Sequence, residues 1–201
     1  MASSYSLTFV NNSARFVSAC VYQTAPDLAN AQSLAWMVQS AQPAASAVFR
    51  WEIEHGFVCS EAVPLVPGAI VEAAEWRAAD LKENNSITLT RQEDHHTFTG
   101  QKAGPHEGSL YIAEDSSVVA GQASVGIGMS GAGTFVVQAQ PNTDLVFTPH
   151  PNYWITAGTA QKGEVLDIGS LTNPVQVEFP AGVYAMTAVL NADNTWSVMP
   201  S

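Results

Sequence analysis

The sequence predicts an all-β protein, and three observations support this. Apolar and polar residues alternate with a period of two in many short segments. These segments are rich in Val, Ile, Thr and aromatic residues, which favour strands. Clusters of Asn, Ser, Gly and Pro separate them. Because such spacing is typical of antiparallel sandwiches and barrels, we expect a two-sheet antiparallel β-sandwich, jelly-roll-like, forming a single domain over residues 1–201.

The expected strands follow one another along the whole chain. Residues 5–10 alternate as Tyr-Ser-Leu-Thr-Phe-Val, and residues 191–194 are expected to turn the chain into a closing hairpin. Residues 92–108 form the longest polar interruption, and we expect a large surface loop there. The segments with a clear period of two are 5–10, 16–23, 48–55, 86–91, 134–138, 175–179, 183–190 and 195–199.

Two segments, 28–38 and 70–81, also fit a helical period. In the first, Leu28, Leu34 and Val38 would share one face of a helix, but residues 33–38 are short and apolar and equally fit a strand buried on both faces. Periodicity does not separate these cases, and we favour strands in both. The residues that we expect in the core are Trp36, Trp51, Phe49, Val21, Phe135, Val137, Phe147, Tyr184 and Trp196.

Composition and charge exclude several classes of partner. The chain has 7 basic and 18 acidic residues among 201, a formal net charge of -11. This balance disfavours nucleic acids and anionic membrane surfaces, because both repel an acidic protein. Only 12% of residues are charged, against about 25% in typical domains, so the surface must be mostly neutral and polar.

The same sequence lacks the usual targeting signals. No apolar stretch approaches the ~20 residues of a spanning helix, so we expect no membrane insertion. The N-terminal residues have no basic region and no long apolar region, which argues against a cleaved signal peptide. We therefore expect either a cytoplasmic protein or one exported without such a peptide.

One glycine-rich segment matches the spacing of a dinucleotide-binding motif. Residues 126–131 spell Gly-Ile-Gly-Met-Ser-Gly, but a strand pattern follows where that motif needs a helix. We interpret the small residues as allowing a bulge or a close approach between backbones. Ser130 does not fit a nucleophile elbow either, since Ala132 stands at its last position. We expect no catalytic residue, no cofactor and no enzymatic activity.

Polar and sulfur-containing side chains offer little metal chemistry. Glu93, Asp94, His95 and His96, with His106 and Glu107 further on, are the strongest metal-ligand cluster. Neighbouring histidines on an extended chain point to opposite faces, so we favour a solvated polar loop and no metal site. Cys20 and Cys59 both lie in apolar segments and are interpreted as buried thiols; a single disulfide is the alternative if the chain is exported.

Two loops around residues 145–148 carry a pattern found in sugar sites. Aromatic faces stack on the C–H surface of a sugar while Asn and Asp side chains bind its hydroxyls. The same residues are ordinary in turns and cores, so a structural role is the alternative. The candidate ligand-binding residues are Asn142, Asp144, His150, Tyr153 and Trp154.

Several segments together resemble a known family. In the first half these are Phe9-Val10-Asn11-Asn12-Ser13, Cys20-Val21-Tyr22-Gln23, Ser33-Leu34-Ala35-Trp36 and Phe49-Arg50-Trp51. In the second half they are the run 126–135, the segment Val137-Gln138-Ala139-Gln140-Pro141-Asn142, and the segment 147–154. The chain is similar, from about Tyr5 to Gly158, to the rhizosphere-induced protein A family of bacteria. The resemblance implies a bacterial, non-enzymatic protein whose expression is linked to quorum sensing, and it brings no catalytic residue or cofactor.

Two functions fit these observations. The first is a structural, self-assembling protein that forms homo-oligomers or filaments, because few Lys and Arg are present to guard the edges of its sheets. The second is a lectin-like carbohydrate-binding module that uses the loops around residues 142–144 and 150–154. In the first case the partner is a second copy of the chain, and in the second it is a glycan.

Overall fold

The computed structural model describes residues 4–24, 28–61 and 64–201, and within them the chain is all-β as expected. A single short 3-10 helix, η1 (Ile168–Ser170), interrupts the strands of this part of the chain. The strands are β1 (Ser4–Asn11), β2 (Val17–Gln23), β3 (Gln32–Ser33), β4 (Met37–Ala41), β5 (Ser46–Glu52), β6 (His55–Glu61), β7 (Glu75–Ala79), β8 (Ser86–Gln92), β9 (His95–Lys102), β10 (Leu110–Glu114), β11 (Ala123–Met129), β12 (Ala132–Gln138), β13 (Thr143–Phe147), β14 (Tyr153–Gly158), β15 (Val175–Val177), β16 (Ala185–Leu190) and β17 (Trp196–Pro200).

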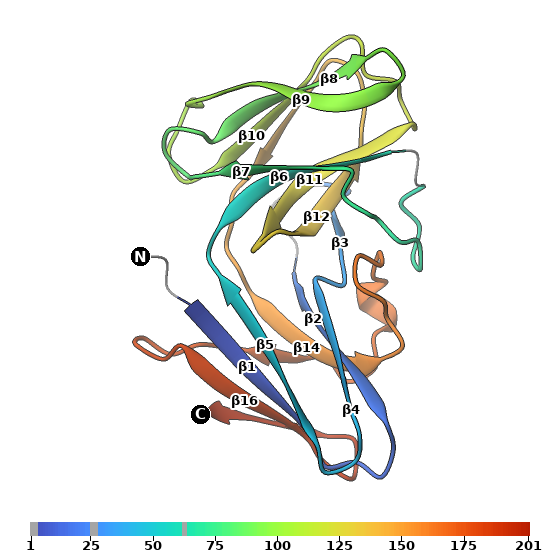
Figure 1. Cartoon of the computed structure of the whole chain (residues 1–201), viewed down its shortest axis with the longest axis vertical. Helices are drawn as coiled ribbons and strands as arrows, with labels where there is room; N and C mark the ends of the chain where they lie inside the picture. The colour runs from blue at the N-terminus through green and yellow to red at the C-terminus, as the bar shows by residue number, and fades with distance from the viewer. Residues whose placement is uncertain (1–3, 25–27, 62–63) are drawn as a thin grey trace.

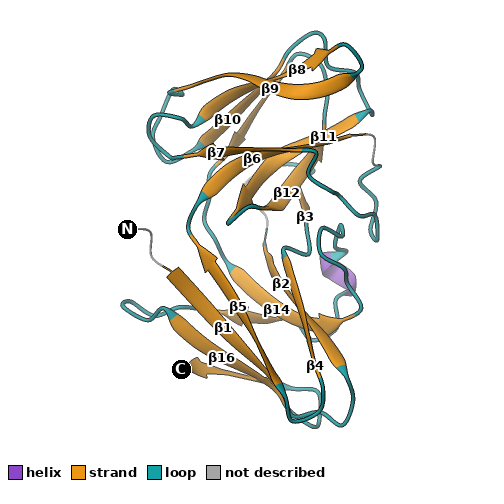
Figure 2. Cartoon of the chain, viewed as in Figure 1, coloured by secondary structure: helices purple, strands orange, loops and turns teal. Residues whose placement is uncertain are grey.

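These strands form four sheets in two stacked lobes, where the sequence led us to expect two sheets (Figure 1, Figure 2). The terminal lobe, in the lower half of Figure 1, holds the sheets β17-β16-β1-β5 and β15-β14-β2-β4. The inserted lobe above it holds β13-β10-β8-β9 and β3-β12-β11-β6-β7. Each lobe is thus a small sandwich with a core of its own.

The inserted lobe is built mainly from one continuous stretch, residues 55–147. The chain enters it from β5 to β6 through only Ile53 and Glu54, and it returns through residues 148–152 between β13 and β14. One short strand, β3, reaches up from the terminal lobe and pairs with β12. The expected strand over 48–55 therefore spans the crossing point between the two lobes.

Strand pairing departs from the expected antiparallel pattern in each lobe. β1 pairs with β16 in parallel, and so does β8 with β10. The other pairs between named strands are antiparallel. Parallel neighbours need a long connection, and here most of the chain connects β1 to β16. Local alternation does not reveal such long-range partners.

The core residues expected from the sequence are mostly buried, with two exceptions. Trp36, Trp51, Phe49, Val21, Phe135, Val137 and Phe147 are buried. Trp196 is only half-buried, and Tyr184 is 48% exposed. Tyr184 precedes β16, and its ring meets the edge of Tyr5 at 5.4 Å between centroids, so it covers the rim of the terminal core.

The expected surface loop over 92–108 is wrong, because residues 95–102 of this segment form strand β9. This strand pairs with β8 and buries Phe98 against the inserted core. Segments 28–38 and 70–81 contain β3, the start of β4 and β7, so the preference for strands is confirmed. Among the described residues, no helix has the length and apolar character to cross a membrane.

Candidate functional site

The glycine-rich segment forms the joint between the two lobes. Ser130 and Gly131 both have positive φ and make the two-residue turn that links β11 to β12. At this turn the amide of Ser130 donates to the carbonyl of Glu54 (2.9 Å), and its hydroxyl accepts from the amide of Glu52 (3.2 Å). The hairpin tip therefore fastens the inserted lobe to the end of β5.

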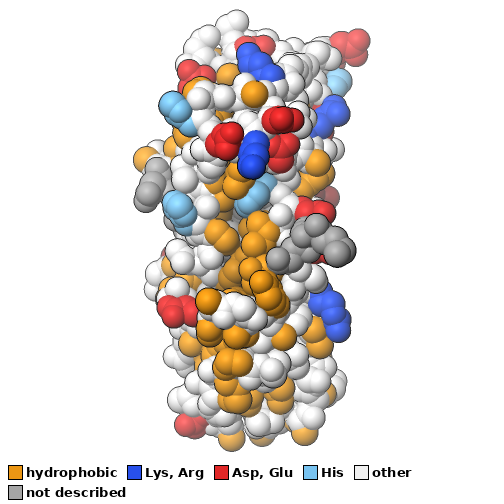
Figure 3. Space-filling view, turned by 90° about the vertical axis from the view of Figure 1, so that its left-hand side faces the viewer, with side chains coloured by type: hydrophobic (Ala, Val, Ile, Leu, Met, Phe, Trp, Pro, Cys, Tyr) orange, Lys and Arg blue, Asp and Glu red, His pale blue; other side chains and the backbone are white. Residues whose placement is uncertain are grey.

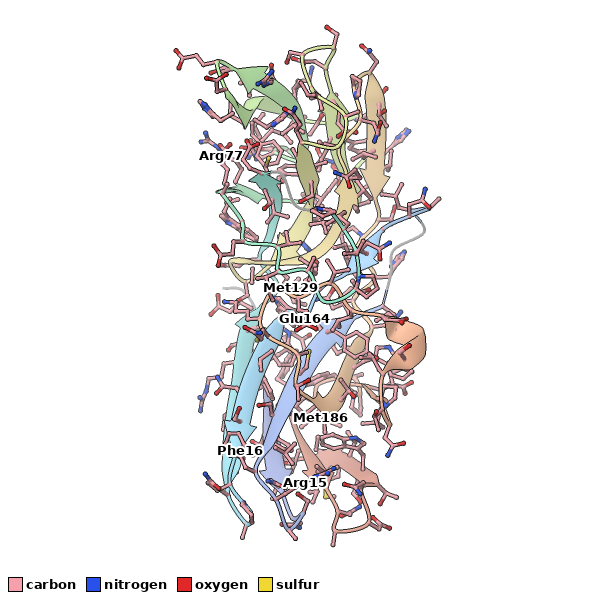
Figure 4. All side chains as sticks on the ribbon, turned by 90° about the vertical axis from the view of Figure 1, so that its right-hand side faces the viewer. Arg15, Phe16, Arg77, Met129, Glu164 and Met186 are labelled. Carbon is pink, nitrogen blue, oxygen red and sulfur yellow. The ribbon has the colours of Figure 1, made fainter. Side chains whose placement is uncertain are left out.

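The side chain of Met129 extends this joint into the terminal core. Met129 is buried among residues of that core, and Figure 4 shows it at the level where the lobes meet. The indole Nε1 of Trp36 donates to the Met129 carbonyl at 2.9 Å, and the Tyr153 hydroxyl lies 3.7 Å from its sulfur. A cavity of about 320 Å³ adjoins the joint, and its lining includes Leu34 and Val58.

The interpretation of residues 126–131 as a site of close backbone approach is confirmed. The pairing register of β11 and β12 shifts between Ile127 and Gly128, which marks a bulge. A Cβ at Gly126 would overlap the carbonyl oxygen of Phe135. Only glycine lets the two strands pack at this distance.

A second feature is the open side of the terminal lobe, where the edge strands β15 and β17 lie. Neither strand contains a charged residue. Trp196 Nε1 donates to the Asn173 carbonyl (2.9 Å), and Asn173 Nδ2 donates to the Asn194 carbonyl (3.1 Å). These bonds connect the segment before β15 to the hairpin of β17. The two uncharged edge strands, β15 and β17, therefore lie on the same side of the terminal lobe.

The outer edge of β17 presents unpaired backbone groups. The amide of Ser201 donates to Ala185 and the amide of Asn191 donates to Thr195, which fixes the alternation of bonded pairs in this antiparallel hairpin. Ser197 and Met199 consequently bond inward to β16. The amide and carbonyl of Val198 then point away from the sheet, available to another strand.

The third feature is a buried carboxyl in the inserted lobe. Leu110, Ile112 and Glu114 occupy alternate positions of β10, and all three are buried. Glu114 is only 3% exposed. Its Oε1 accepts from the amide of Gln140 at 3.1 Å, whereas its Oε2 has no hydrogen-bond partner. Burial raises the pKa of Glu114 from 4.5 to about 7, although the bond from Gln140 opposes this shift.

Sequence reasoning missed Glu114, yet a signal was available. Glu114 stands on the same face of its strand as Leu110 and Ile112, where the alternation of apolar and polar residues predicts an apolar side chain. Buried carboxylates are rare without a partner. The hydrogen-bond donor to Glu114, Gln140, belongs to the segment 137–142, one of those that carry the family resemblance.

The predicted sugar-site residues are divided between β13 and β14 and the segments before these strands. Asn142 has positive φ in the turn before β13, and Asp144 is exposed on that strand, both in the inserted lobe. His150 is exposed between the lobes, and Tyr153 is buried against Trp36 and Trp51 in the terminal core. Trp154 is half-buried and stacks on Tyr22. The structure therefore does not gather these five side chains around one surface.

Of the histidine-rich cluster, His95 and His96 begin strand β9, whereas Glu93, Asp94, His106 and Glu107 lie in turns or bends, as expected for a polar loop. His95 is exposed and His96 is buried, on opposite faces of β9 as expected for an extended chain. His96 Nε2 accepts from the amide of Val119 (3.3 Å), so its Nδ1 donates to Glu61 Oε2 (3.1 Å). Within the described residues, no three His, Cys, Asp or Glu side chains are placed to hold a metal ion.

The two cysteines are free and buried, as the sequence led us to expect. Cys20 lies in β2 of the terminal lobe and Cys59 in β6 of the inserted lobe. Burial raises the pKa of each thiol to about 12, with nearby carboxylates adding to the shift. Both sulfurs are therefore unreactive thiols at neutral pH.

Comparison with known proteins shows the family of the chain. The family model for RhiA matches residues 2–201, and the chain belongs to the RhiA family. It is 38% identical over 201 residues to Protein RhiA of Rhizobium leguminosarum bv. viciae, covering 98% of this chain and 87% of that protein. No solved structure matches the chain significantly.

Proposed function

We propose that this protein is a non-catalytic structural protein that assembles into homo-oligomers or filaments through the open edge of its terminal lobe. A strand edge with free amides and carbonyls is a template for another strand. The edge in question consists of β15 and β17, and the contacting partner is a second copy of the same chain.

The observation that carries this proposal is the lack of charged side chains on β15 and β17, compared with three edge strands of the inserted lobe. Charged side chains guard three edge strands of the inserted lobe: Glu75 and Arg77 on β7, Lys102 on β9 and Asp144 on β13. β15 and β17 carry none, and Met199 on β17 is 44% exposed. Charges on an edge oppose strand addition, so the terminal lobe is the more favourable side for assembly.

The apolar surface is distributed in the same way. Figure 3 shows hydrophobic side chains gathered over the middle and lower part of one face, while charged groups concentrate in the upper half. The half-exposed rings of Tyr5 and Phe179 and the exposed ring of Tyr184 form one aromatic cluster in the terminal lobe. Aromatic residues are enriched at protein interfaces, which supports contacts between copies through this lobe.

The test is solution mass measured by light scattering after size exclusion, over a wide range of protein concentration. We expect a mass that rises above 21.3 kDa with concentration. Met199→Lys places a charge on the outward face of β17 and should return the mass to that of the monomer. The matched control is Val146→Lys, because Val146 is 43% exposed on the guarded edge strand β13; it should leave assembly unchanged.

Two results would contradict the proposal. A mass of 21.3 kDa at every concentration would exclude assembly by the chain alone. An oligomer that resists Met199→Lys but dissociates with Val146→Lys would move the interface to the inserted lobe.

A further inference from the structure

A cleft in the inserted lobe lies between the segment 29–32 and strands β12 and β13. Its volume is about 460 Å³, within the range of small-molecule sites in proteins. One wall comes from the start of the chain, with Asn30 and Gln32, and the other comes from Gln138, Gln140 and Thr143. Segments more than a hundred residues apart in sequence thus converge on one hollow.

The side chain of Glu114 lines this cleft. It is more than nine-tenths buried, and its Oε2 is a hydrogen-bond acceptor without a donor in the protein. A buried polar atom without a partner destabilises the fold, and no group of the described protein bonds to this oxygen. A ligand that donates a hydrogen bond to Oε2 would offset this destabilisation.

The other groups in the cleft define the chemistry of such a ligand. They are amides and one hydroxyl, from Asn30, Gln32, Gln138 and Thr143, beside an apolar patch that includes Val137 and Leu145. Glu114 is the sole charged side chain among the described residues of the lining. This combination suits a neutral molecule with several hydroxyl groups and a C–H face, because each amide can both donate and accept.

We propose that the Glu114 cleft binds a neutral saccharide of one or two sugar units, with a hydroxyl donating to Glu114 Oε2. The amides of Gln32 and Gln138 bind further hydroxyls, and the sugar's C–H face contacts Val137 and Leu145. This site shares with the sugar site expected from the sequence only the neighbourhood of Asn142, and it contains no aromatic platform. It is also separate from the edge of the terminal lobe, so it does not depend on assembly.

The test is ligand-observed NMR on the full chain with a panel of neutral mono- and disaccharides, and with choline and spermidine as cationic probes. We expect saturable binding of at least one sugar and none of either cation. Glu114→Gln keeps an oxygen for the Gln140 amide but removes the second acceptor, and it should weaken binding at least tenfold. Glu107→Gln, an exposed carboxylate of the same lobe, should change binding less than twofold.

A second variant keeps the test independent of the fold around Glu114. Gln32 lies on the opposite wall, and Gln32→Ala should weaken the same sugar about threefold or more while the thermal midpoint stays unchanged. Absence of any sugar binding by the wild-type chain would overturn the proposal. So would sugar binding that tolerates both substitutions, or binding of a cation in place of the sugars.

Discussion

The two lobes share an arrangement of strands but bury different side chains. In the sheet β17-β16-β1-β5 a parallel central pair is flanked by antiparallel neighbours, and β13-β10-β8-β9 repeats this order. The buried cluster of the terminal lobe includes Trp36, Trp51 and Tyr153, whereas the buried aromatic residues of the inserted cluster are all Phe. Residues 55–147 also hold eleven of the eighteen acidic and four of the seven basic side chains. The same arrangement of strands therefore accompanies an uncharged edge in the terminal lobe and a charged surface with a cleft in the inserted lobe.

Buried polar groups sharpen the contrast between the lobes. Asn11 in the terminal lobe is fully buried, and its amide donates to the carbonyls of Arg15 and Ala41 while its oxygen accepts from Ser13. Glu114 in the inserted lobe is as deeply buried but leaves one oxygen unpaired. A fully bonded group stabilises a fold, whereas a partly bonded one is retained at a cost, which is why we assign ligand binding to the inserted lobe.

The largest expected effect comes from backbone packing inside the inserted lobe. Gly126→Ala would force a methyl group into the Phe135 carbonyl, and we expect a loss of about 3 kcal/mol or more in the free energy of unfolding. The matched control in the terminal lobe is Gly158→Ala on β14, where a Cβ meets nothing within 4 Å. Urea unfolding should show that control within about 1 kcal/mol of wild type. Equal effects of the two substitutions would contradict the close approach of β11 and β12.

A smaller effect, dependent on pH, is expected at Glu114. Because its folded pKa is raised from 4.5 to about 7, the folded state binds more protons than the unfolded state between these values. Its contribution to stability is therefore complete below pH 4.5 and is lost as pH rises to 7. Glu114→Gln should stabilise the protein at pH 8 by up to about 3 kcal/mol, and the gain should disappear near pH 4.

The measurement for Glu114 is the difference in unfolding free energy between variant and wild type at several pH values. Taking the difference cancels the titration of the other carboxylates. Glu107→Gln is the matched control, since this carboxylate of the same lobe is exposed. A gain from Glu114→Gln of equal size at pH 4 and pH 8 would show that the carboxyl is not the cause.

Local patterns predicted the strands well and the assembly of sheets poorly. Alternation located β1, β8 and β16 because each buries one face. No linker in the sequence marks the division into lobes, since the chain crosses from β5 to β6 through only Ile53 and Glu54. The polar residues around Phe98 concealed β9, whose partner strand and Glu61 contact compensate for them.

The candidate sites were predictable to unequal degrees. The scarcity of Lys and Arg indicated that some edge strands would lack charged side chains. Which strands these are depends on the order of the strands in each sheet. The predicted sugar site placed Tyr153 on a surface, whereas its ring completes the aromatic core with Trp36 and Trp51. The Glu114 cleft needs Gln32 and Gln140 on facing walls, an arrangement of distant segments that no local pattern encodes.

The smallest expected effect tests whether the lobes act as one unit. Trp36 Nε1 donates to the Met129 carbonyl in a buried bond of 2.9 Å between the lobes, and Trp196 Nε1 makes an exposed bond of equal length to Asn173 within the terminal lobe. We expect Trp36→Phe to cost about 1–2 kcal/mol and Trp196→Phe to cost about 0.5 kcal/mol or less, because only the first leaves a buried carbonyl unpaired.

The readout for this pair is amide hydrogen exchange, which resolves the stability of each lobe. If the joint couples the lobes, Trp36→Phe should accelerate exchange in both β2 and β11, whereas Trp196→Phe should act near β17 alone. Acceleration confined to the terminal lobe would mean that the inserted sandwich holds its fold without the joint. In that case the docking of Met129 fixes only the orientation of the two lobes, and the cleft and the edge would function as independent parts.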